Sequence, residues 1–425
     1  MHEDLLFARC ARRLIPFMVV LYTLAWLDRV NVSFAALTMN RDLGFSPTVF
    51  GFGAGIFFLG YFAFQIPANL LLARIGVRLW ITCIVMTWGA LSAAGALVED
   101  PGTFYVLRFL LGVAEAGFVP GMIYYLTLWF PHSYRARFTA GFMAAIPLSY
   151  ILGAPISTAI LELDGALGLR GWQWLFLIEG LPACLLALAV PKLMPNGPAD
   201  ATWLSAQDKA MIVGRLARED AAKRSEVWPA LLDTRVLVLC FVSFAAGIGS
   251  AGITLWLPQI LQSMGYSNAS IGPLLAGFGL IGMAAMFVWG RSSDKRDERV
   301  WHVSLPLLVA ATGLIVAASL SLTAAVSLVA LACILIGLLA IDGPFFALPS
   351  SFLGGAAVAG GIALINSTGS LGAFVGPVLI GVLKEQTGGY ATGMIALAIA
   401  LIFAATAVLL LGRAMMARPL LQGEH

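Results

Sequence analysis

Residues 14–38, LIPFMVVLYTLAWLDRVNVSFAALT, decide how this chain folds. The run is apolar and long enough to cross a hydrocarbon layer of about 30 Å as a helix. It nevertheless carries Asp28 and Arg29 side by side. A charge near the centre of a bilayer costs roughly 3 kcal/mol on insertion scales, so such residues usually have a function. The stretch therefore predicts a membrane helix with an ionic site inside it.

Apolar runs of this kind recur along all 425 residues, of which 60% are hydrophobic and 11% charged. Twelve runs are long enough to span a membrane, and they leave no room for a soluble catalytic domain. We predict an all-α integral membrane protein with twelve transmembrane helices in two pseudo-symmetric six-helix bundles. The predicted parts are residues 1–190 for the first bundle, 191–233 for a cytoplasmic linker and 234–425 for the second bundle. The predicted spans are 14–38, 47–73, 78–98, 101–129, 137–162, 171–190, 234–262, 268–290, 302–322, 325–349, 357–383 and 389–412.

The distribution of lysine and arginine predicts the orientation of the helices. Twenty of these residues fall in loops on one side of the predicted helices and three on the other. Because basic loops stay in the cytoplasm, both termini and the linker are predicted to be cytoplasmic, in a bacterial-type inner (cell) membrane. The first apolar run is too long for a cleavable signal peptide. The net charge of +3 reflects this bias and does not indicate nucleic-acid binding.

The composition also argues against enzymatic chemistry. The five cysteines lie far apart, and the four histidines lie at termini or helix ends without partner spacing. No disulfide framework or zinc spacing is present, and we expect neither a metal nor another cofactor. Serine, histidine and acidic residues form no nucleophile–base pattern, so the sequence predicts a protein that is not an enzyme.

Four charged residues inside apolar runs are the candidate functional residues. Arg108 and Glu115 are seven apart, which places them on one face of a helix, about 10 Å apart along its axis. Asp28 and Arg29 are neighbours, so their side chains diverge by about 100°, and we expect one to face a cavity and the other a neighbouring helix. A static network of ion pairs is the alternative, although such pairs stabilise poorly.

Each of the four has a predicted role. An arginine stays charged and binds a planar carboxylate through two hydrogen bonds, so Arg29 is the candidate for binding an anion. A carboxylate deprived of water binds a proton more readily, so Asp28 and Glu115 are candidates for proton coupling. Arg108 is predicted to hold Glu115 in its ionised form until a proton releases it.

Other polar positions are candidates for lining the substrate route. Tyr61 and Gln65 lie four apart in one predicted helix, as do Asn366 and Ser370 in another. Asp342 precedes a predicted helix break at Gly343–Pro344, where it either lines the route or caps the break. Glu179 is interpreted as a structural partner of other polar groups.

Six segments resemble the major facilitator superfamily, and within it the anion:cation symporter family of organic-acid importers. The resemblance covers residues 14–412 and implies a two-bundle fold, proton-driven carboxylate import and a monomer in the lipid bilayer. It assigns proton coupling to Asp28, Glu115 and Arg108, and substrate contact to Arg29, Tyr61 and Asn366. Phe346 is a further candidate for substrate contact, at a position where relatives often have tryptophan. The segments are YTLAWLDRVNVSFA (22–35), GYFAFQIPANLLL (60–72), RFLLGVAEAGFVPG (108–121), GWQWLFLIEGLPA (171–183), DGPFFALPSSFL (342–353) and GGIALINSTGSLGAFVGP (360–377).

The sequence of residues 137–190 is similar to that of the tartrate and hydroxyphenylacetate branch of the family. The sequence therefore predicts a proton-coupled symporter of a small organic anion, with a tartrate-like hydroxydicarboxylate as the favoured substrate. The adjacent Phe345 and Phe346 support an aromatic carboxylate as the alternative. A drug/proton antiporter is a further alternative, although such a protein has less need of an anion-binding residue such as Arg29.

Overall fold

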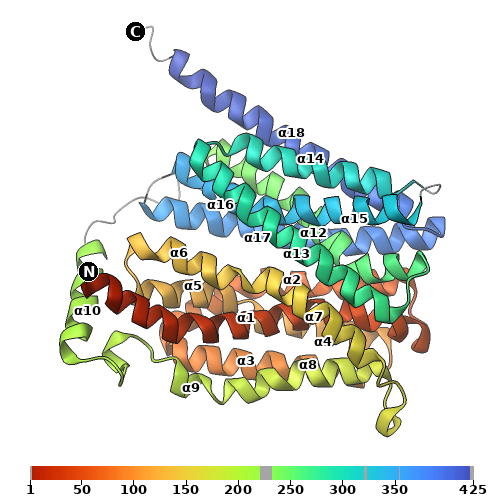
Figure 1. The fold of residues 1–425 in the computed structure, drawn as a ribbon, viewed down its shortest axis with the longest axis horizontal. Helices are drawn as coiled ribbons and strands as arrows, with labels where there is room; N and C mark the ends of the chain where they lie inside the picture. The colour runs from red at the N-terminus through yellow and green to blue at the C-terminus, as the bar shows by residue number, and fades with distance from the viewer. Residues whose placement is uncertain (1, 221–231, 320–322, 354, 422–425) are drawn as a thin grey trace. The chain divides into compact units, whose positions relative to one another are not determined.

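The computed structural model describes residues 2–220, 232–319, 323–353 and 355–421 (Figure 1). Within these ranges every regular element is a helix, as predicted. Eleven described helical spans are long and apolar enough to cross a membrane, and Gly171–Ala187 is a shorter apolar helix between the fifth and sixth of them. Together they match the twelve predicted spans. Residues 221–231 of the predicted linker and 320–322 of one predicted span lie outside the described residues.

The chain divides into two compact units, one of Met1–Met39 with Gly60–Lys223, the other of Asn40–Leu59 with Arg224–His425. Helices α1 and α2 contribute to both units, a feature that the predicted bundle boundaries do not contain. The first ten helices are α1 (His2–Asp42), α2 (Pro47–Ile75), α3 (Val77–Ala94), α4 (Pro101–Glu115), α5 (Phe118–Trp129), α6 (His132–Met143), α7 (Ala145–Leu161), α8 (Gly171–Ala187), α9 (Val190–Leu193) and α10 (Ala206–Asp220). The others are α12 (Thr234–Ser263), α13 (Asn268–Arg296), α14 (Val300–Ala317), α15 (Ala324–Ala340), α16 (Asp342–Ala347), α17 (Gly355–Thr387) and α18 (Ala391–Leu421).

Three predicted spans are interrupted. The fourth breaks at Ala116–Gly117 into α4 and α5, the fifth breaks at Ala144 into α6 and α7, and the tenth breaks at Ile341 into α15 and α16. The last break confirms the one predicted beside Asp342. At Gly117 a Cβ atom would lie 2.6 Å from the Trp80 ring, so only glycine allows the backbone to turn this close to α3.

Close helix contacts in the first unit depend on small residues. Helices α3 and α8 lie side by side (Figure 1), and a Cβ on Gly180 would lie 2.6 Å from the Ala93 backbone nitrogen. On α2, a Cβ on Gly60 would clash with the Phe109 carbonyl of α4. These approaches fix which side chains of neighbouring helices meet.

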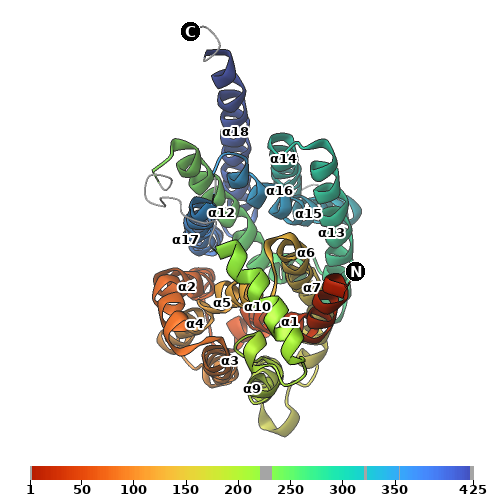
Figure 2. The same ribbon diagram turned by 90° about the vertical axis from the view of Figure 1, so that its left-hand side faces the viewer.

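In the second unit, too, glycine allows helices to pack closely. Helices α12 and α17 lie against each other (Figure 2), and a Cβ on Gly372 would clash with the Phe244 carbonyl. The Trp256 indole of α12 donates to the Pro377 carbonyl of α17 over 3.1 Å.

Helix α10 and the segment before it pack on the first unit. Arg9 of α1 donates to Asp208 of α10 over 2.5 Å, and the Trp203 ring stacks on Trp129 with centroids 5.6 Å apart. The Arg13 guanidinium lies over the Trp203 ring, 5.1 Å from its centroid. This part of the predicted linker therefore forms a helix, and the first turn of that helix is docked on α1.

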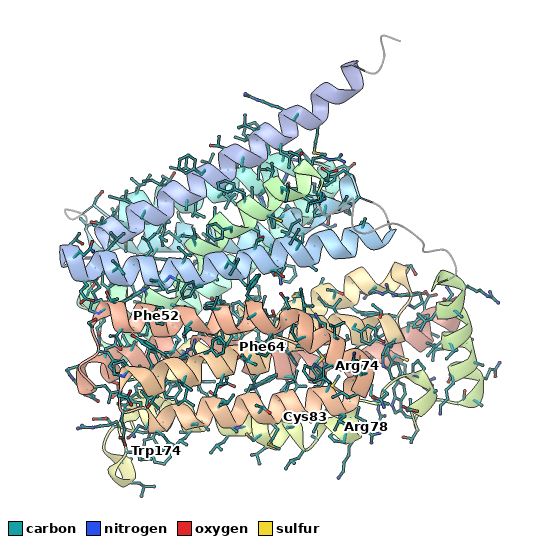
Figure 3. The ribbon with its side chains drawn as sticks, turned by 180° about the vertical axis from the view of Figure 1, so that it is seen from behind. Phe52, Phe64, Arg74, Arg78, Cys83 and Trp174 are labelled. Atoms are coloured by element: carbon teal, nitrogen blue, oxygen red, sulfur yellow. The ribbon has the colours of Figure 1, made fainter. Side chains whose placement is uncertain are left out.

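Basic residues mark one end of the first unit. Arg74 and Arg78 lie at one end of the α2–α3 pair, while Trp174 of α8 lies at the opposite end (Figure 3). An end rich in arginine and an opposite end bearing an interfacial tryptophan are typical of membrane helices.

The contact between Asp208 and Arg9 makes the docking of α10 sensitive to acid. Burial acts to raise the pKa of the Asp208 carboxyl, but hydrogen bonds from Arg9 and Ser205 outweigh it and hold this pKa below its ordinary value. The contact therefore stabilises docking above the ordinary aspartate pKa of about 3.9 and is lost as pH falls through the lower folded value.

We predict that Asp208→Asn lowers the amide-exchange protection of α10 at pH 7, because the ion pair is removed. The difference from the unmodified protein should shrink near pH 3, where Asp208 of the unmodified protein is also becoming neutral. Hydrogen exchange read by mass spectrometry checks this, with the exposed Asp200→Asn in the same segment as the control. Equal protection of α10 in both variants at pH 7 would contradict it.

Candidate functional site

The side chains of Asp28 and Arg29 diverge, as predicted from their adjacency on α1. Asp28 faces α3, where the Ser92 hydroxyl donates to its Oδ1 atom over 2.5 Å. Arg29 faces α4 and donates to Oε2 of Glu115 over 2.8 Å. The four predicted charged residues therefore divide between two adjoining places in the first unit.

The ion pair of Arg29 and Glu115 is the first of these places. The Glu115 side chain is 1% exposed and the Arg29 side chain 13%, so the guanidinium is the more accessible partner. Oε1 of Glu115 has no hydrogen-bond partner among the described residues. Glu115 ends α4 immediately before the break at Gly117, which leaves its side chain at a bend in the helix.

Aromatic rings flank the Arg29 guanidinium on two sides. Its central carbon lies 5.1 Å from the Trp26 ring and 5.1 Å from the Tyr61 ring. Cation–π contacts of this kind stabilise a charge where water is scarce. Tyr61 is buried on α2, and Gln65, one turn further along the same helix, is buried too. The structure thus places Tyr61 beside Arg29.

The predicted pairing of Arg108 with Glu115 stays a prediction, because the ion pair that the structure shows at this acid is with Arg29. Glu115 forms its ion pair with Arg29, and the Arg108 guanidinium donates to the Arg29 backbone carbonyl over 3.3 Å. The reason is distance along the helix. Two turns separate Arg108 from Glu115 on α4, whereas α1 lies alongside and brings Arg29 directly opposite the acid. Arg108 thus supports the backbone that carries Arg29.

Asp28 lies in the second place, which is fully buried. Asn31, one turn along α1, donates to Oδ1 of Asp28 over 3.5 Å and to Ser92 over 3.3 Å. Oδ2 of Asp28 has no hydrogen-bond partner in the described part of the chain. No ion pair of Asp28 occurs within the described residues, so this acid differs in kind from Glu115.

The remaining predicted residues belong to the second unit. The rings of Phe345 and Phe346 on α16 are 5.3 Å apart, with Phe345 buried and Phe346 36% exposed. On α17 the Ser370 hydroxyl donates to the Asn366 backbone carbonyl over 3.3 Å, and Asn366 is exposed. Asp342 is the first residue of α16, and no side-chain hydrogen bond caps that helix. The cap interpretation of Asp342 is therefore not supported.

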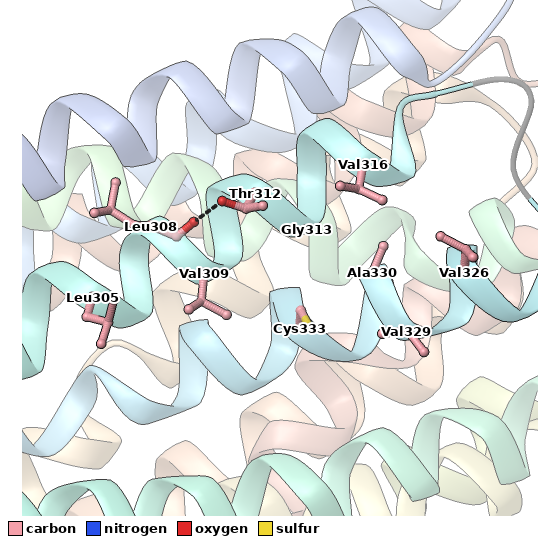
Figure 4. Close-up of a pocket in the computed structure, with 10 residues that line it drawn as sticks. All are labelled: Leu305, Leu308, Val309, Thr312, Gly313, Val316, Val326, Val329, Ala330 and Cys333. Carbon is pink, nitrogen blue, oxygen red and sulfur yellow. Dashed lines mark hydrogen bonds between the residues drawn. The ribbon is translucent and has the colours of Figure 1, made fainter.

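Two cavities differ sharply in character. A groove of about 350 Å³ between α14 and α15 is lined by aliphatic side chains with Thr312 and Cys333, and the Thr312 hydroxyl is bonded to the Leu308 carbonyl (Figure 4). It contains no charged group that would bind a carboxylate. A smaller cavity of about 10 Å³ in the first unit is lined by Ser92, Arg108 and Phe176 among others, beside the acidic groups.

The geometry suits an anion and a proton. A carboxylate that replaced Glu115 at the Arg29 guanidinium would find a charged donor between two aromatic rings. Protonated Glu115 would lose most of its hold on Arg29. No group of three or more metal-binding side chains comes together in the described ranges.

Sequence reasoning missed Asn31 and Ser92, which contact Asp28, and Ser157, whose hydroxyl donates to Glu179. The available signal was weak. Asn31 lies three residues after Asp28 and hence on a similar face of α1, and the two serines are small polar residues inside apolar helices. Serine in a membrane helix also bonds its own backbone, so its presence alone does not indicate a site.

Comparison with known proteins gives three findings. A model of the Major Facilitator Superfamily matches residues 18–377. A protein of Agrobacterium vitis named "Putative tartrate transporter" is 48% identical over 94% of this chain and 93% of its own length. The "Quinolone resistance transporter" of Acinetobacter baumannii is 40% identical over 92% of this chain and 91% of its own.

A solved structure supports the fold. The crystal structure of a bacterial homolog of the human lysosomal transporter Spinster, inward-facing and occupied, has a TM-score of 0.77 with this chain at 18% identity. The likeness covers 94% of this chain and 96% of the other.

The contact of Gly60 with α4 positions Tyr61 beside Arg29, and we predict that Gly60→Ala destabilises the protein. The added methyl group has no room against the Phe109 carbonyl, and overpacking of this kind costs about 1–3 kcal/mol. Unfolding of the purified protein in mixed detergent micelles measures the change. Gly141→Ala on α6 is the control, since a Cβ there meets its nearest atom at 3.9 Å. Equal stability of the two variants would contradict the packing argument.

Proposed function

Since the chain belongs to the major facilitator superfamily, we propose that it is a proton-coupled symporter that imports a small organic carboxylate. The favoured substrate is a tartrate-like hydroxydicarboxylate, and transport proceeds by alternating access. The observation that carries the proposal is the buried ion pair of Arg29 and Glu115, flanked by Trp26 and Tyr61. The name of the 48% identical relative supports the choice of substrate.

Coupling follows from competition for one guanidinium. Arg29 is always charged, so it requires an anionic partner wherever water is excluded. In the absence of substrate that partner is Glu115, at 2.8 Å. A substrate carboxylate takes the position of Glu115, and the displaced acid is stabilised by binding a proton. Substrate binding and proton binding therefore favour each other, as linkage requires.

The difference in exposure between Arg29 and Glu115 determines which of the two a solute carboxylate meets. The Glu115 carboxyl is almost completely enclosed, whereas the Arg29 guanidinium retains a small exposed area. A solute carboxylate therefore meets the arginine rather than the acid. Hydrogen bonds between charged groups contribute about 1.5–3 kcal/mol each, and a bidentate contact makes two of them.

Proton coupling also resolves an energetic difficulty. Moving an anion into a negative interior costs about 2.3 kcal/mol per charge for every 100 mV. Asp28 and Glu115 together supply two protons, which more than neutralise a monoanion and balance the two charges of a hydroxydicarboxylate, so the membrane potential opposes the import of neither. In this proposal protons are the coupling ion, the protein acts as a monomer in an inner membrane with cytoplasmic termini, and no other cofactor takes part.

Two alternatives have support from particular observations. The exposed Phe346 ring beside Phe345 favours an aromatic carboxylate such as a hydroxyphenylacetate. The 40% identical relative named for quinolone resistance favours a drug/proton antiporter. Uptake into proteoliposomes under an inside-alkaline pH gradient distinguishes them, with labelled tartrate, labelled hydroxyphenylacetate and a lipophilic cation compared in parallel. Protonophore-sensitive accumulation of tartrate supports the proposal, whereas export of the cation without acid uptake contradicts it.

We predict that Arg29→Ala weakens tartrate binding by about 30-fold or more, since losing one partner of a buried charge pair costs about 2–5 kcal/mol. Arg29→Lys should bind with intermediate affinity, because it keeps the charge but loses the planar fork. Isothermal titration of the purified protein measures both. The exposed Arg41→Ala serves as the control. Undiminished affinity in Arg29→Ala would exclude the binding role of Arg29.

Glu115→Gln should uncouple transport while leaving binding measurable. The glutamine cannot release or accept a proton and does not compete for Arg29 as an anion. Exchange of labelled for unlabelled tartrate should continue, whereas accumulation driven by a pH gradient should fall to the level of the protonophore control. Glu162→Gln, at an exposed helix end, is the matched control. Accumulation by Glu115→Gln at the unmodified level would show that another residue couples the proton.

A further inference from the structure

Glu179 of α8 lies in the same buried polar cluster as Asp28. The Ser157 hydroxyl of α7 donates to Oε1 of Glu179 over 2.6 Å. Asn31 lies beside Glu179, with no hydrogen bond between the two side chains within the described residues, and donates to Asp28. The cluster therefore places two carboxyl groups near one amide, with side chains from α1, α3, α7 and α8. We call it the Asp28–Glu179 cluster, and its members are Asp28, Asn31, Ser92, Ser157 and Glu179.

Every member of the Asp28–Glu179 cluster is buried, and the most exposed, Glu179, retains 4% of its surface. An ionised carboxylate in such a place requires a cation or several donors. Neither Asp28 nor Glu179 forms an ion pair within the described residues. Two ionised carboxylates in one cluster would also repel each other strongly at low dielectric.

The Asp28–Glu179 cluster has more hydrogen-bond acceptors than donors. Oδ2 of Asp28, Oδ1 of Asn31 and Oε2 of Glu179 each lack a hydrogen-bond partner in the described ranges. All three are acceptors, and the two serine hydroxyls already donate to the other carboxyl oxygens. A proton on a carboxyl group turns an acceptor into a donor. Protonation of the acids therefore supplies the kind of group that the cluster lacks.

The charged and titratable groups around the cluster interact electrostatically with Asp28. From α4, Glu115 and Arg108 exert electrostatic effects on Asp28, the first repulsive to a carboxylate and the second attractive. On α8 itself Cys184 senses the charge of Asp28. Helices α3 and α7 contribute the neutral Ser92 and Ser157. Glu179 is thus the more isolated of the two acids from any cation.

The helix packing around Glu179 leaves little room for water. Gly180 follows it directly, and a Cβ there would lie 2.6 Å from the Ala93 backbone of α3. A Cβ on Gly89 would lie 2.9 Å from the Ala183 methyl group. Hydration therefore cannot replace protonation at Glu179 while α3 and α8 stay packed. The cavity lined by Ser92 and Arg108, at about 10 Å³, has space for one water at most, beside the cluster.

We propose that Glu179 is a third proton-carrying acid of the transport cycle, in the same buried cluster as Asp28. This rests on the proposed proton-coupled import. In each cycle a carboxyl O–H bond of the cluster breaks, the electron pair remains on the carboxylate oxygen, and water accepts the proton. A hydroxydicarboxylate carries two negative charges at neutral pH, so two protons make its import electroneutral and a third lets the membrane potential drive it.

The test counts protons. Proteoliposomes with the membrane potential held at zero are loaded with labelled tartrate under a pH gradient of one unit, and the final accumulation ratio is measured. Each coupled proton raises that ratio tenfold at this gradient. We expect Glu179→Gln to accumulate about tenfold less tartrate than the unmodified protein. Glu179→Asp keeps an acid and should accumulate as much tartrate as the unmodified protein. The exposed Glu162→Gln is the control.

The glutamine variant separates this role from a structural one. Glutamine has the shape of a protonated glutamate and can still accept from Ser157, so a merely structural Glu179 would leave the accumulation ratio unchanged. That outcome overturns the proposal.

Infrared spectroscopy of the full-length protein in lipid provides a reading that does not depend on substrate. We expect a band of protonated carboxyl at neutral pH that loses intensity in Glu179→Gln and moves to higher wavenumber in Ser157→Ala, which removes a donor. If the unmodified protein accumulates no acid at all, the proposed function fails and the infrared result decides this inference alone. A carboxyl band unaffected by both substitutions overturns it.

Discussion

The ion pair of Arg29 and Glu115 is the interaction on which the rest of the first unit depends. A guanidinium remains charged at every accessible pH, so a buried arginine must always have a counter-charge. Glu115 provides it from the bend that ends α4, and Trp26 and Tyr61 shield the pair from solvent. An arginine that can never be neutral beside an acid that can be is the simplest arrangement in which an anion and a proton exchange places.

That arrangement requires accurate helix packing, because each partner comes from a different helix. Gly60 brings α2 against α4, and a Cβ on Gly153 of α7 would clash with Leu27 of α1. Gly180 and Gly89 bring α8 against α3. In a bilayer, where apolar burial between helices contributes little, close backbone approach through small residues supplies much of the packing energy. The glycines therefore determine the geometry of the site without touching it.

The limits of what the sequence could predict follow from the same fact. Hydropathy predicts the spans because each depends on local composition, and the break beside Asp342 follows from Gly343 and Pro344 in the next positions. The divergence of Asp28 and Arg29 follows from helix geometry alone. The partner of Glu115 does not, since it depends on which face of α1 lies against α4. Periodicity on α4 suggested Arg108, and only the packing of two helices shows that Arg29 is closer.

Glu179 illustrates the same limit. Within its own helix it has no polar neighbour at helical spacing that would mark it as part of a site, so it was interpreted as a structural residue. Asn31 and Ser157 come from separate helices, and only their meeting gives Glu179 a relation to Asp28.

The three acids of the first unit lie in environments that favour different protonation states. Glu115 has a permanent cation within 2.8 Å and therefore stays ionised until an anion competes for that cation. Asp28 and Glu179 have no ion pair within the described residues, and their cluster lacks donors rather than acceptors. Titratable groups placed in contrasting environments commonly divide the work of a proton-transfer site. In the proposed cycle Glu115 responds to the substrate directly, while Asp28 and Glu179 respond to changes in helix packing that alter their access to water.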